Sequence, residues 1–177
     1  MNPWHDISET RITPGNFVAV IEIPKGSKKK YELDKETGML ILDRILSTST
    51  HYPENYGFIP LTLAGDNDPL DVLVICEDKL NPISLVECRP IGVLKMTDNN
   101  EVDEKIVAVP VSDTVLGDCT DISSLPKHQF NRIRHFFEVY KYLENKQTEV
   151  GEICSAEEAQ NIIGESLKNY RNKFKNI

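Results

Sequence analysis

The chain has 177 residues, of which 40% are hydrophobic and 27% are charged, and its formal net charge is −8. This composition excludes global disorder, and the length predicts a single domain over residues 1–177. The acidic balance argues against a protein that binds nucleic-acid backbones through bulk positive charge.

The first residues of the chain, its short apolar runs and its cysteines predict a cytoplasmic location. The first residues, MNPWHDISET, have neither the basic nor the apolar region of a signal peptide. Apolar runs stay far below the ~20 residues needed to span a bilayer. The four cysteines are widely spaced and form no C-x-x-C pair, so we expect buried, reduced thiols rather than a zinc or redox motif: Cys76, Cys88, Cys119 and Cys154.

A strand-rich body is predicted for the first two thirds of the chain. The run FVAVIEI at 17–23 is typical of a strand, and Pro24 closes it. Residues 31–34 and 40–46 flank a Gly-containing connection that suits a hairpin. Further short strands are predicted at 70–75, 83–88, 92–96 and 106–111. We expect Pro90 and Pro110 to end their strands, because proline cannot donate to a ladder.

Two helices are predicted after the strands. From Lys127 to Leu143 the apolar residues recur at helical spacing, and Pro126 suits the first turn. A second helix should begin at Ser155, because Glu158 three residues later completes a capping box. The predicted fold is therefore α+β and mainly β: a five-stranded, OB-like β-barrel with two packed α-helices.

The densest chemical signal is the stretch Asp66-Asn67-Asp68-Pro69-Leu70-Asp71-Val72. A plain turn explains its first half, and that interpretation stays open. Asp71, however, directly precedes an apolar run, where a carboxylate is costly to bury without a cation. The mutual repulsion of three carboxylates also favours a hard divalent ion. A calcium EF-hand is excluded, because Asp71 stands where that loop needs Gly.

A second acidic group and a scattered set of cations complete the chemical pattern. The stretch from Asp98 to Lys105 is either a solvated hairpin loop or a second part of the same barrel rim. Taken singly, the lysines and the arginine of this set are compatible with an exposed surface, and the tyrosines with core packing. Together they could hold a phosphate-sized anion: Lys28, Lys29, Lys30, Arg44, Tyr52, Tyr56, Tyr140 and Lys141.

The Asp-rich stretch matches the D-x-D-P-x-D-V pattern of soluble family I inorganic pyrophosphatases. Flanking segments resemble that family in the same order: VIEIP, KYELDKETG, DR, YPENYGFIP, GVLKMTD and HFFEVYK. The resemblance covers roughly residues 15 to 145, and the length is that of the bacterial type. It implies a five-stranded barrel with helices over one pyrophosphatase domain, and it agrees with the pattern analysis.

The resemblance implies a role for each matching residue. Asp68 matches the general base. Metal ligands would be Asp66, Asp71, Asp98, Asp103 and, through water, Glu22, with Asp71 between two activating ions. Phosphate-holding groups would be Lys30, Arg44, Tyr56, Lys105, Tyr140 and Lys141. Glu32 and Tyr52 match supporting positions.

Three positions depart from the family pattern. A segment with Trp that often follows the Tyr-Lys pair is shorter here and has no Trp, so Lys146 is only a candidate for a phosphate contact. Asn99 stands where an acid is common beside Asp98. Val139 replaces a His that some bacterial members place at a subunit contact.

The expected activity is hydrolysis of pyrophosphate to two orthophosphates by a metal-activated water, which pulls biosynthetic reactions forward. The resemblance implies several Mg²⁺ ions per active site, with Mn²⁺ or Zn²⁺ as substitutes and Ca²⁺ as an inhibitor, in a homohexamer. Neither nucleic acid nor membrane is an expected partner. The alternatives are a non-catalytic metal-binding barrel and an oligonucleotide-binding barrel. The seven carboxylates and four cations proposed for the site leave a charge of −3 there, which suggests an anionic substrate held through metal.

Overall fold

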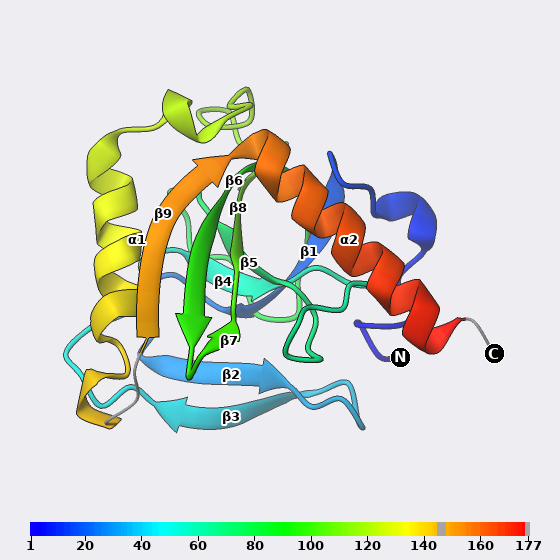
Figure 1. The fold of residues 1–177 in the computed structure, drawn as a ribbon, viewed down its shortest axis with the longest axis horizontal. Helices are drawn as coiled ribbons and strands as arrows, with labels where there is room; N and C mark the ends of the chain where they lie inside the picture. The colour runs from blue at the N-terminus through cyan, green and yellow to red at the C-terminus, as the bar shows by residue number, and fades with distance from the viewer. Residues whose placement is uncertain (145–147, 176–177) are drawn as a thin grey trace.

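A closed ring of five strands forms the body of the protein in a computed structural model, which describes residues 1–144 and 148–175. The ring consists of β1 (Phe17–Ile23), β4 (Asn55–Phe58), β5 (Asp71–Val74), β8 (Lys105–Pro110) and β6 (Leu85–Asp98). It closes because β1 pairs with both β4 and β6 (Figure 1). The prediction of a mainly β fold with five strands and two helices is therefore confirmed.

The remaining strands extend this body. β7 (Glu101–Val102) and β9 (Thr148–Ser155) both pair with β6. β2 (Lys29–Leu33) and β3 (Leu40–Ile45) form a separate two-stranded sheet at one end of the ring (Figure 1). Single 3-10 turns cover Glu9–Arg11, Ile122–Ser124 and Tyr142–Glu144.

Two helices cover different parts of the ring. α1 (Lys127–Val139) packs beside β9, and α2 (Ala156–Phe174) crosses over β6 (Figure 1). Ser155 caps α2, as predicted, by accepting a hydrogen bond from the Glu158 backbone at 3.4 Å. The Glu158 carboxylate, which the predicted capping box needs, pairs with Lys95 instead. Pro126 takes the N-cap position of α1 rather than its first turn, and Leu143 lies beyond the helix and is exposed.

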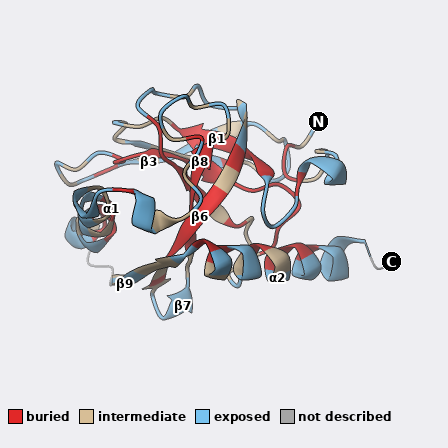
Figure 2. Ribbon diagram, turned by 90° about the horizontal axis from the view of Figure 1, so that it is seen from above, coloured by how far each residue is buried: buried red, intermediate tan, exposed pale blue. Residues whose placement is uncertain are grey.

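Two apolar clusters explain why the central strands are apolar throughout. In β5, Val72 and Val74 join the cluster under α2, whereas Leu73 and the following Ile75 join the cluster under α1. Successive side chains of a strand point to opposite faces, so a strand covered on both faces loses its polar alternation. Figure 2 shows this burial along β6 and β8.

Close packing also explains a strand that the pattern missed. β4 has the sequence NYGF, and glycine is unfavourable in strands. A Cβ on Gly57 would lie 1.8 Å from the Val20 carbonyl oxygen of β1. The glycine therefore lets two strands approach closely, which local sequence does not reveal.

The prediction that Pro90 ends a strand is wrong. Residues 85–88 of the first predicted segment and all of the second, 92–96, belong to one 14-residue strand, β6, and residues 83 and 84 precede it. A register irregularity between Pro90 and Gly92 accommodates the proline, since a bulge leaves one residue unpaired. Pro110 does end β8 as predicted. Among the described residues, neither helix is long and apolar enough to cross a membrane.

Candidate active site

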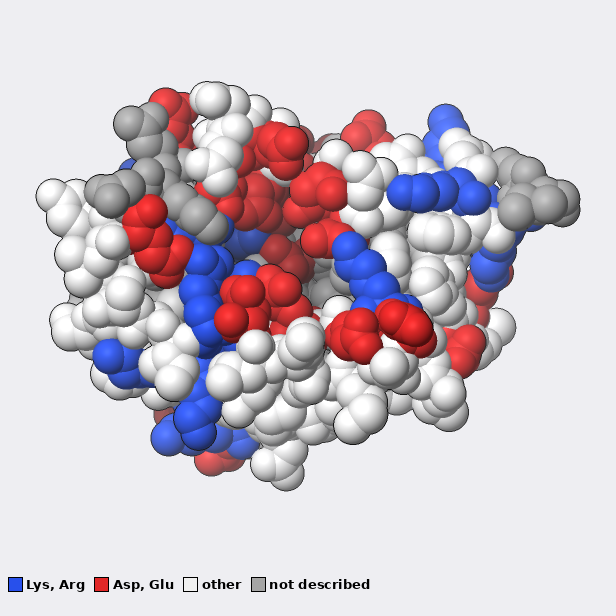
Figure 3. Space-filling view, turned by 90° about the horizontal axis from the view of Figure 1, so that it is seen from below, with Lys and Arg blue, Asp and Glu red and all other residues white. Residues whose placement is uncertain are grey.

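Carboxylates and lysines gather in one hollow of the surface, below the ring and beside the β2–β3 sheet (Figure 3). Seven acidic side chains line it: Glu22, Glu32, Asp66, Asp68, Asp71, Asp98 and Asp103. Four lysines line the same hollow: Lys30, Lys35, Lys105 and Lys141. Buried aromatic side chains of Tyr52, Tyr56, Phe137 and Tyr140 complete its wall.

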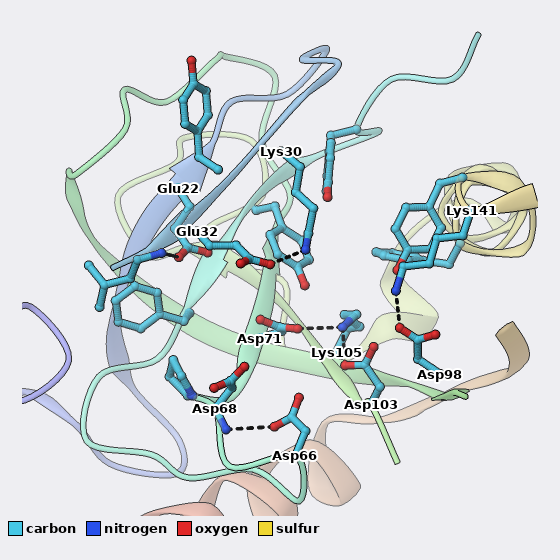
Figure 4. A pocket seen from close by; sticks show the side chains of 18 of the residues that line it. Glu22, Lys30, Glu32, Asp66, Asp68, Asp71, Asp98, Asp103, Lys105 and Lys141 are labelled. Carbon is cyan, nitrogen blue, oxygen red and sulfur yellow. Dashed lines mark hydrogen bonds and ion pairs between the residues drawn. The ribbon is translucent and has the colours of Figure 1, made fainter. Parts of the chain in front are cut away.

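The pairing of β5 with β8 places the central ion pairs. The two strands run parallel, and Asp71 is the register partner of Lys105. Lys105 Nζ lies 2.6 Å from Asp71 Oδ2 and 2.5 Å from Asp103 Oδ1 (Figure 4). Burial alone would lower the pKa of Lys105, but the two carboxylates raise it above its ordinary value. This lysine is therefore a fixed positive charge at the base of the hollow.

A tight hairpin between β6 and β7 brings Asp98 and Asp103 to the same place. Asp98 pairs with Glu101, and the two residues between them, Asn99 and Asn100, have φ of +50° and +66°. A two-residue hairpin of this kind requires positive φ at both positions, and asparagine tolerates it well. The turn geometry thus accounts for Asn99 where the family often has an acid.

Asp98 forms an ion pair with Lys141, which follows α1 (Figure 4). Burial lowers the pKa of Lys141 below its ordinary value. The other oxygen of Asp98, Oδ1, is buried and has no hydrogen-bond partner among the described residues. An orphaned carboxylate oxygen inside a protein calls for an additional cation or donor.

The loop before β5 presents Asp66 and Asp68. Asn67 has φ of +68°, and the Asp68 backbone donates a hydrogen bond to Asp66 Oδ1 at 3.0 Å. Such an Asx turn directs both carboxylates toward the hollow (Figure 4). Burial raises the pKa of Asp66, and the Asp68 and Asp71 charges add to this effect.

Glu22 enters the site through an irregularity of β1. Ile21 and Ile23 pair with adjacent residues of β4, so Glu22 is the extra residue of a bulge. It is 6% exposed and accepts a hydrogen bond from the Leu33 backbone at 2.8 Å. Burial, and after it the charge of Asp71, raises the pKa of Glu22 to about 8. Bulges commonly aim a side chain into an active site in this way.

The β2–β3 sheet supplies the opposite wall. Lys30 forms ion pairs with Glu32 and Asp43. Arg44 is the register partner of Lys30, but it lies beside the hollow rather than in its wall, where it pairs with Glu144 and Asp43. All the other predicted site residues line the hollow. Lys146 falls outside the described residues.

The tyrosines remain neutral donors. Burial raises the pKa of Tyr52, Tyr56 and Tyr140 above the ordinary value. The rings of Tyr52 and Tyr56 lie 5.3 Å apart, and Tyr52 packs against Phe136 at 4.7 Å. This aromatic packing holds the hydroxyl groups in place.

Sequence reasoning missed Lys35, which lines the hollow and forms an ion pair with Asp68. It lies in the KYELDKETG segment that carries part of the family resemblance. The sequence pattern placed it only in the Gly-containing connection of the predicted hairpin, with no role of its own.

The residues fit a hard divalent cation. As they stand, no three Asp, Glu, His or Cys side chains within 1–144 and 148–175 converge on one metal position, and lysines lie between several of the carboxylates. The donors are nevertheless all oxygen, which Mg²⁺ prefers. With every group ionised, the seven carboxylates and four lysines would carry a formal net charge of −3. Burial first, and the neighbouring carboxylates after it, raise the pKa of Asp66 and Glu22, and a cation bound beside them would offset both effects. The unpartnered Asp98 oxygen offers such a cation a ligand.

Comparisons with known proteins agree with this chemistry. The family model described as inorganic pyrophosphatase matches residues 19–171. Soluble inorganic pyrophosphatase 2 of Chlamydomonas reinhardtii is 46% identical over 173 residues, which are 98% of this chain and 90% of that protein. The crystal structure of inorganic pyrophosphatase from Thermus thermophilus is 36% identical with a TM-score of 0.92, over 97% of this chain and 99% of that one. The enzyme from Helicobacter pylori is 40% identical with a TM-score of 0.89, over 94% and 99% of the two chains.

Proposed function

This chain belongs to the soluble inorganic pyrophosphatase family and hydrolyses pyrophosphate to two orthophosphates, and we propose that Mg²⁺ ions held by the carboxylates of the hollow support the reaction. The observation that carries the proposal is the gathering of seven carboxylates in one hollow, two of which flank the buried Lys105. Family membership supports the reading as an enzyme over a non-catalytic metal-binding or oligonucleotide-binding barrel.

The residues that would hold the ions are Asp66, Asp71, Asp98 and Asp103, with Glu22 behind them. When bound, Mg²⁺ lowers the pKa of water, orients it and neutralises phosphate charge. Asp71 and Asp103 flank the same lysine, so both carboxylates already face one point in space. Asp98 offers its unpaired oxygen from the neighbouring hairpin.

Asp68 is the proposed general base. Its side chain is half exposed at the mouth of the hollow, so a water molecule can reach it. Asp68 would take a proton from the attacking water while the water oxygen bonds to one phosphorus. The bond from that phosphorus to the bridging oxygen then breaks, and one orthophosphate leaves.

The cations and tyrosines of the hollow would hold the two phosphates. Lys30, Lys105 and Lys141 lie on its different walls, and Tyr56 and Tyr140 stay protonated as donors. Arg44, which pairs with Asp43 and Glu144 beside the hollow, would be a further contact to the same anion. Fixed positive charge beside the leaving phosphate stabilises the negative charge that develops there. Glu32 and Tyr52 support these groups by contact with Lys30 and Tyr56.

The direct test is phosphate release from pyrophosphate by the purified protein. We expect no more than background release after dialysis against EDTA and full recovery when Mg²⁺ is added back. Mn²⁺ or Zn²⁺ should restore part of the rate, and Ca²⁺ should inhibit in the presence of Mg²⁺, since a larger ion fits octahedral demands poorly. Undiminished release in EDTA would contradict the metal requirement.

We also propose a homohexamer, which rests on the resemblance to bacterial members. Val139, on α1, stands where some members carry a contact histidine and is only partly buried in this chain. Size-exclusion chromatography with light scattering measures the assembly, and a monomeric mass would contradict it. The cytoplasmic location stays a prediction that cell fractionation can check.

A further inference from the structure

The N-terminal segment is built into the loop that carries Asp68. Trp4 is 3% exposed. Its Nε1 donates a hydrogen bond to the Thr62 carbonyl at 2.9 Å, and its own carbonyl accepts one from the Leu61 backbone at 3.0 Å. A buried aromatic residue with both polar groups satisfied is a firm anchor.

Thr62 connects Trp4 to the loop that carries Asp66 and Asp68. It is fully buried, and its Oγ1 accepts a hydrogen bond from the Leu70 backbone at 2.9 Å. Two residues further on, the Ala64 backbone donates to the Asp68 carbonyl at 2.8 Å. The backbone on both sides of Asp68 is therefore tied to the segment that Trp4 fixes.

The same N-terminal segment fixes Lys35 on the turn between β2 and β3. Asn2 Nδ2 donates to the Lys35 carbonyl at 2.9 Å. Gly38 of this turn has φ of +72°, and a Cβ there would lie 2.8 Å from the Met1 carbonyl oxygen. The turn and the chain start thus pack directly on each other.

The side chain of Lys35 joins these two anchored parts. Its Nζ lies 5.8 Å from the centre of the Trp4 ring and forms an ion pair with Asp68 Oδ1. An isolated ion pair between half-exposed side chains would have little effect. Here the aromatic face and the tethered backbone already restrict the lysine side chain, so forming the ion pair costs less conformational entropy.

We propose that Lys35 is a positioning residue for Asp68 and that the Trp4 ring holds the Lys35 side chain in place. Lys35 holds Oδ1, which leaves Oδ2 of the same carboxylate to accept the proton from water. The inference rests on the proposed role of Asp68 as the base. It assigns a function to the N-terminal segment, which lies outside the residues that the family model matches.

The experiment is a double-mutant cycle measured by phosphate release. Lys35→Met should lower kcat about tenfold with little change in KM, because a misplaced base loses part of the roughly 10²-fold that positioning supplies. Lys35→Arg should retain most of the rate, since arginine keeps the charge and stacks on aromatic rings. Lys127→Met, at an exposed lysine at the start of α1, is the matched control and should not change kcat.

The cycle distinguishes positioning from substrate contact. In the Asp68→Asn background, Lys35→Met should change kcat less than about twofold, because its partner is already lost. Additive effects, or a rise in KM alone, would overturn the inference and leave the proposed function intact. If Asp68→Asn alone leaves the rate unchanged, the assignment of the base fails first.

A second readout needs no activity. Trp4 is the only tryptophan in the sequence, so its fluorescence reports on the contact between Lys35 and the Trp4 ring. Lys35→Met should shift the Trp4 emission, whereas Lys127→Met should leave it as in the wild type. Identical emission from the Lys35→Met variant and the wild type would contradict a lysine held over the ring.

Discussion

Replacing Asp71 by alanine is expected to lower kcat for pyrophosphate hydrolysis by about 10³-fold. Losses of this size are typical when one group that stabilises developing charge in the transition state is removed. Asp71 is the first residue of β5 and lies against Lys105 at 2.6 Å. Its removal would take away a proposed metal ligand and also half of the charge that faces a buried lysine. Steady-state phosphate release at saturating Mg²⁺ measures the loss.

The second effect of that substitution must be separated from the first. A buried lysine that loses a partner destabilises a protein by about 3–5 kcal/mol in severe cases. Asp71→Asn keeps the shape and a hydrogen-bond acceptor for Lys105, so it should fold well and still be inactive. Thermal unfolding monitored by circular dichroism checks the folded state of both variants.

The matched control is Asp118→Ala, at an exposed acidic residue outside the hollow. It should retain full activity and stability, because exposed substitutions change stability by less than about 0.5 kcal/mol. Asp103→Ala should behave like Asp71→Ala, since Asp103 lies against the same lysine at 2.5 Å. Unimpaired hydrolysis by a folded Asp71 or Asp103 variant would remove that residue from the proposed metal site.

Asp68→Asn is expected to lower kcat by about 10²-fold or more, because a general base contributes roughly 10²–10⁴. The amide has the same shape but accepts no proton at neutral pH. Metal binding should persist, since Asp68 is proposed as the base and not as a ligand. Isothermal titration with Mg²⁺ and a pH–rate profile together measure the two properties.

Two results would contradict this role. An unchanged pH–rate profile with an unchanged rate would exclude Asp68 as the base. A loss of Mg²⁺ binding would instead make Asp68 a ligand. Asp118→Asn again serves as the control, because it removes one carboxylate of the same kind from the exposed surface.

Much of the fold could be predicted because the strands carry local signals. The apolar runs that became β1, β5 and β8 were recognisable, as was the cap of α2 at Ser155. β4 and β9 were missed: β4 contains a glycine that only the close approach of β1 explains, and β9 has a largely polar, partly exposed pattern. Pro90 was misjudged because a bulge, which depends on the partner strand, accommodates it.

The sequence by itself determined the chemistry of this protein: an oxygen-rich, acidic motif with lysines and tyrosines in a family order, and hence the reaction. Only the tertiary structure decided which charges meet. Asp71 and Lys105 are 34 residues apart and become neighbours through parallel pairing of β5 with β8. Lys35 meets Asp68 because the N-terminal segment packs on both their loops. Residue types record what a site can bind, whereas contacts between distant residues depend on the packing of the whole chain.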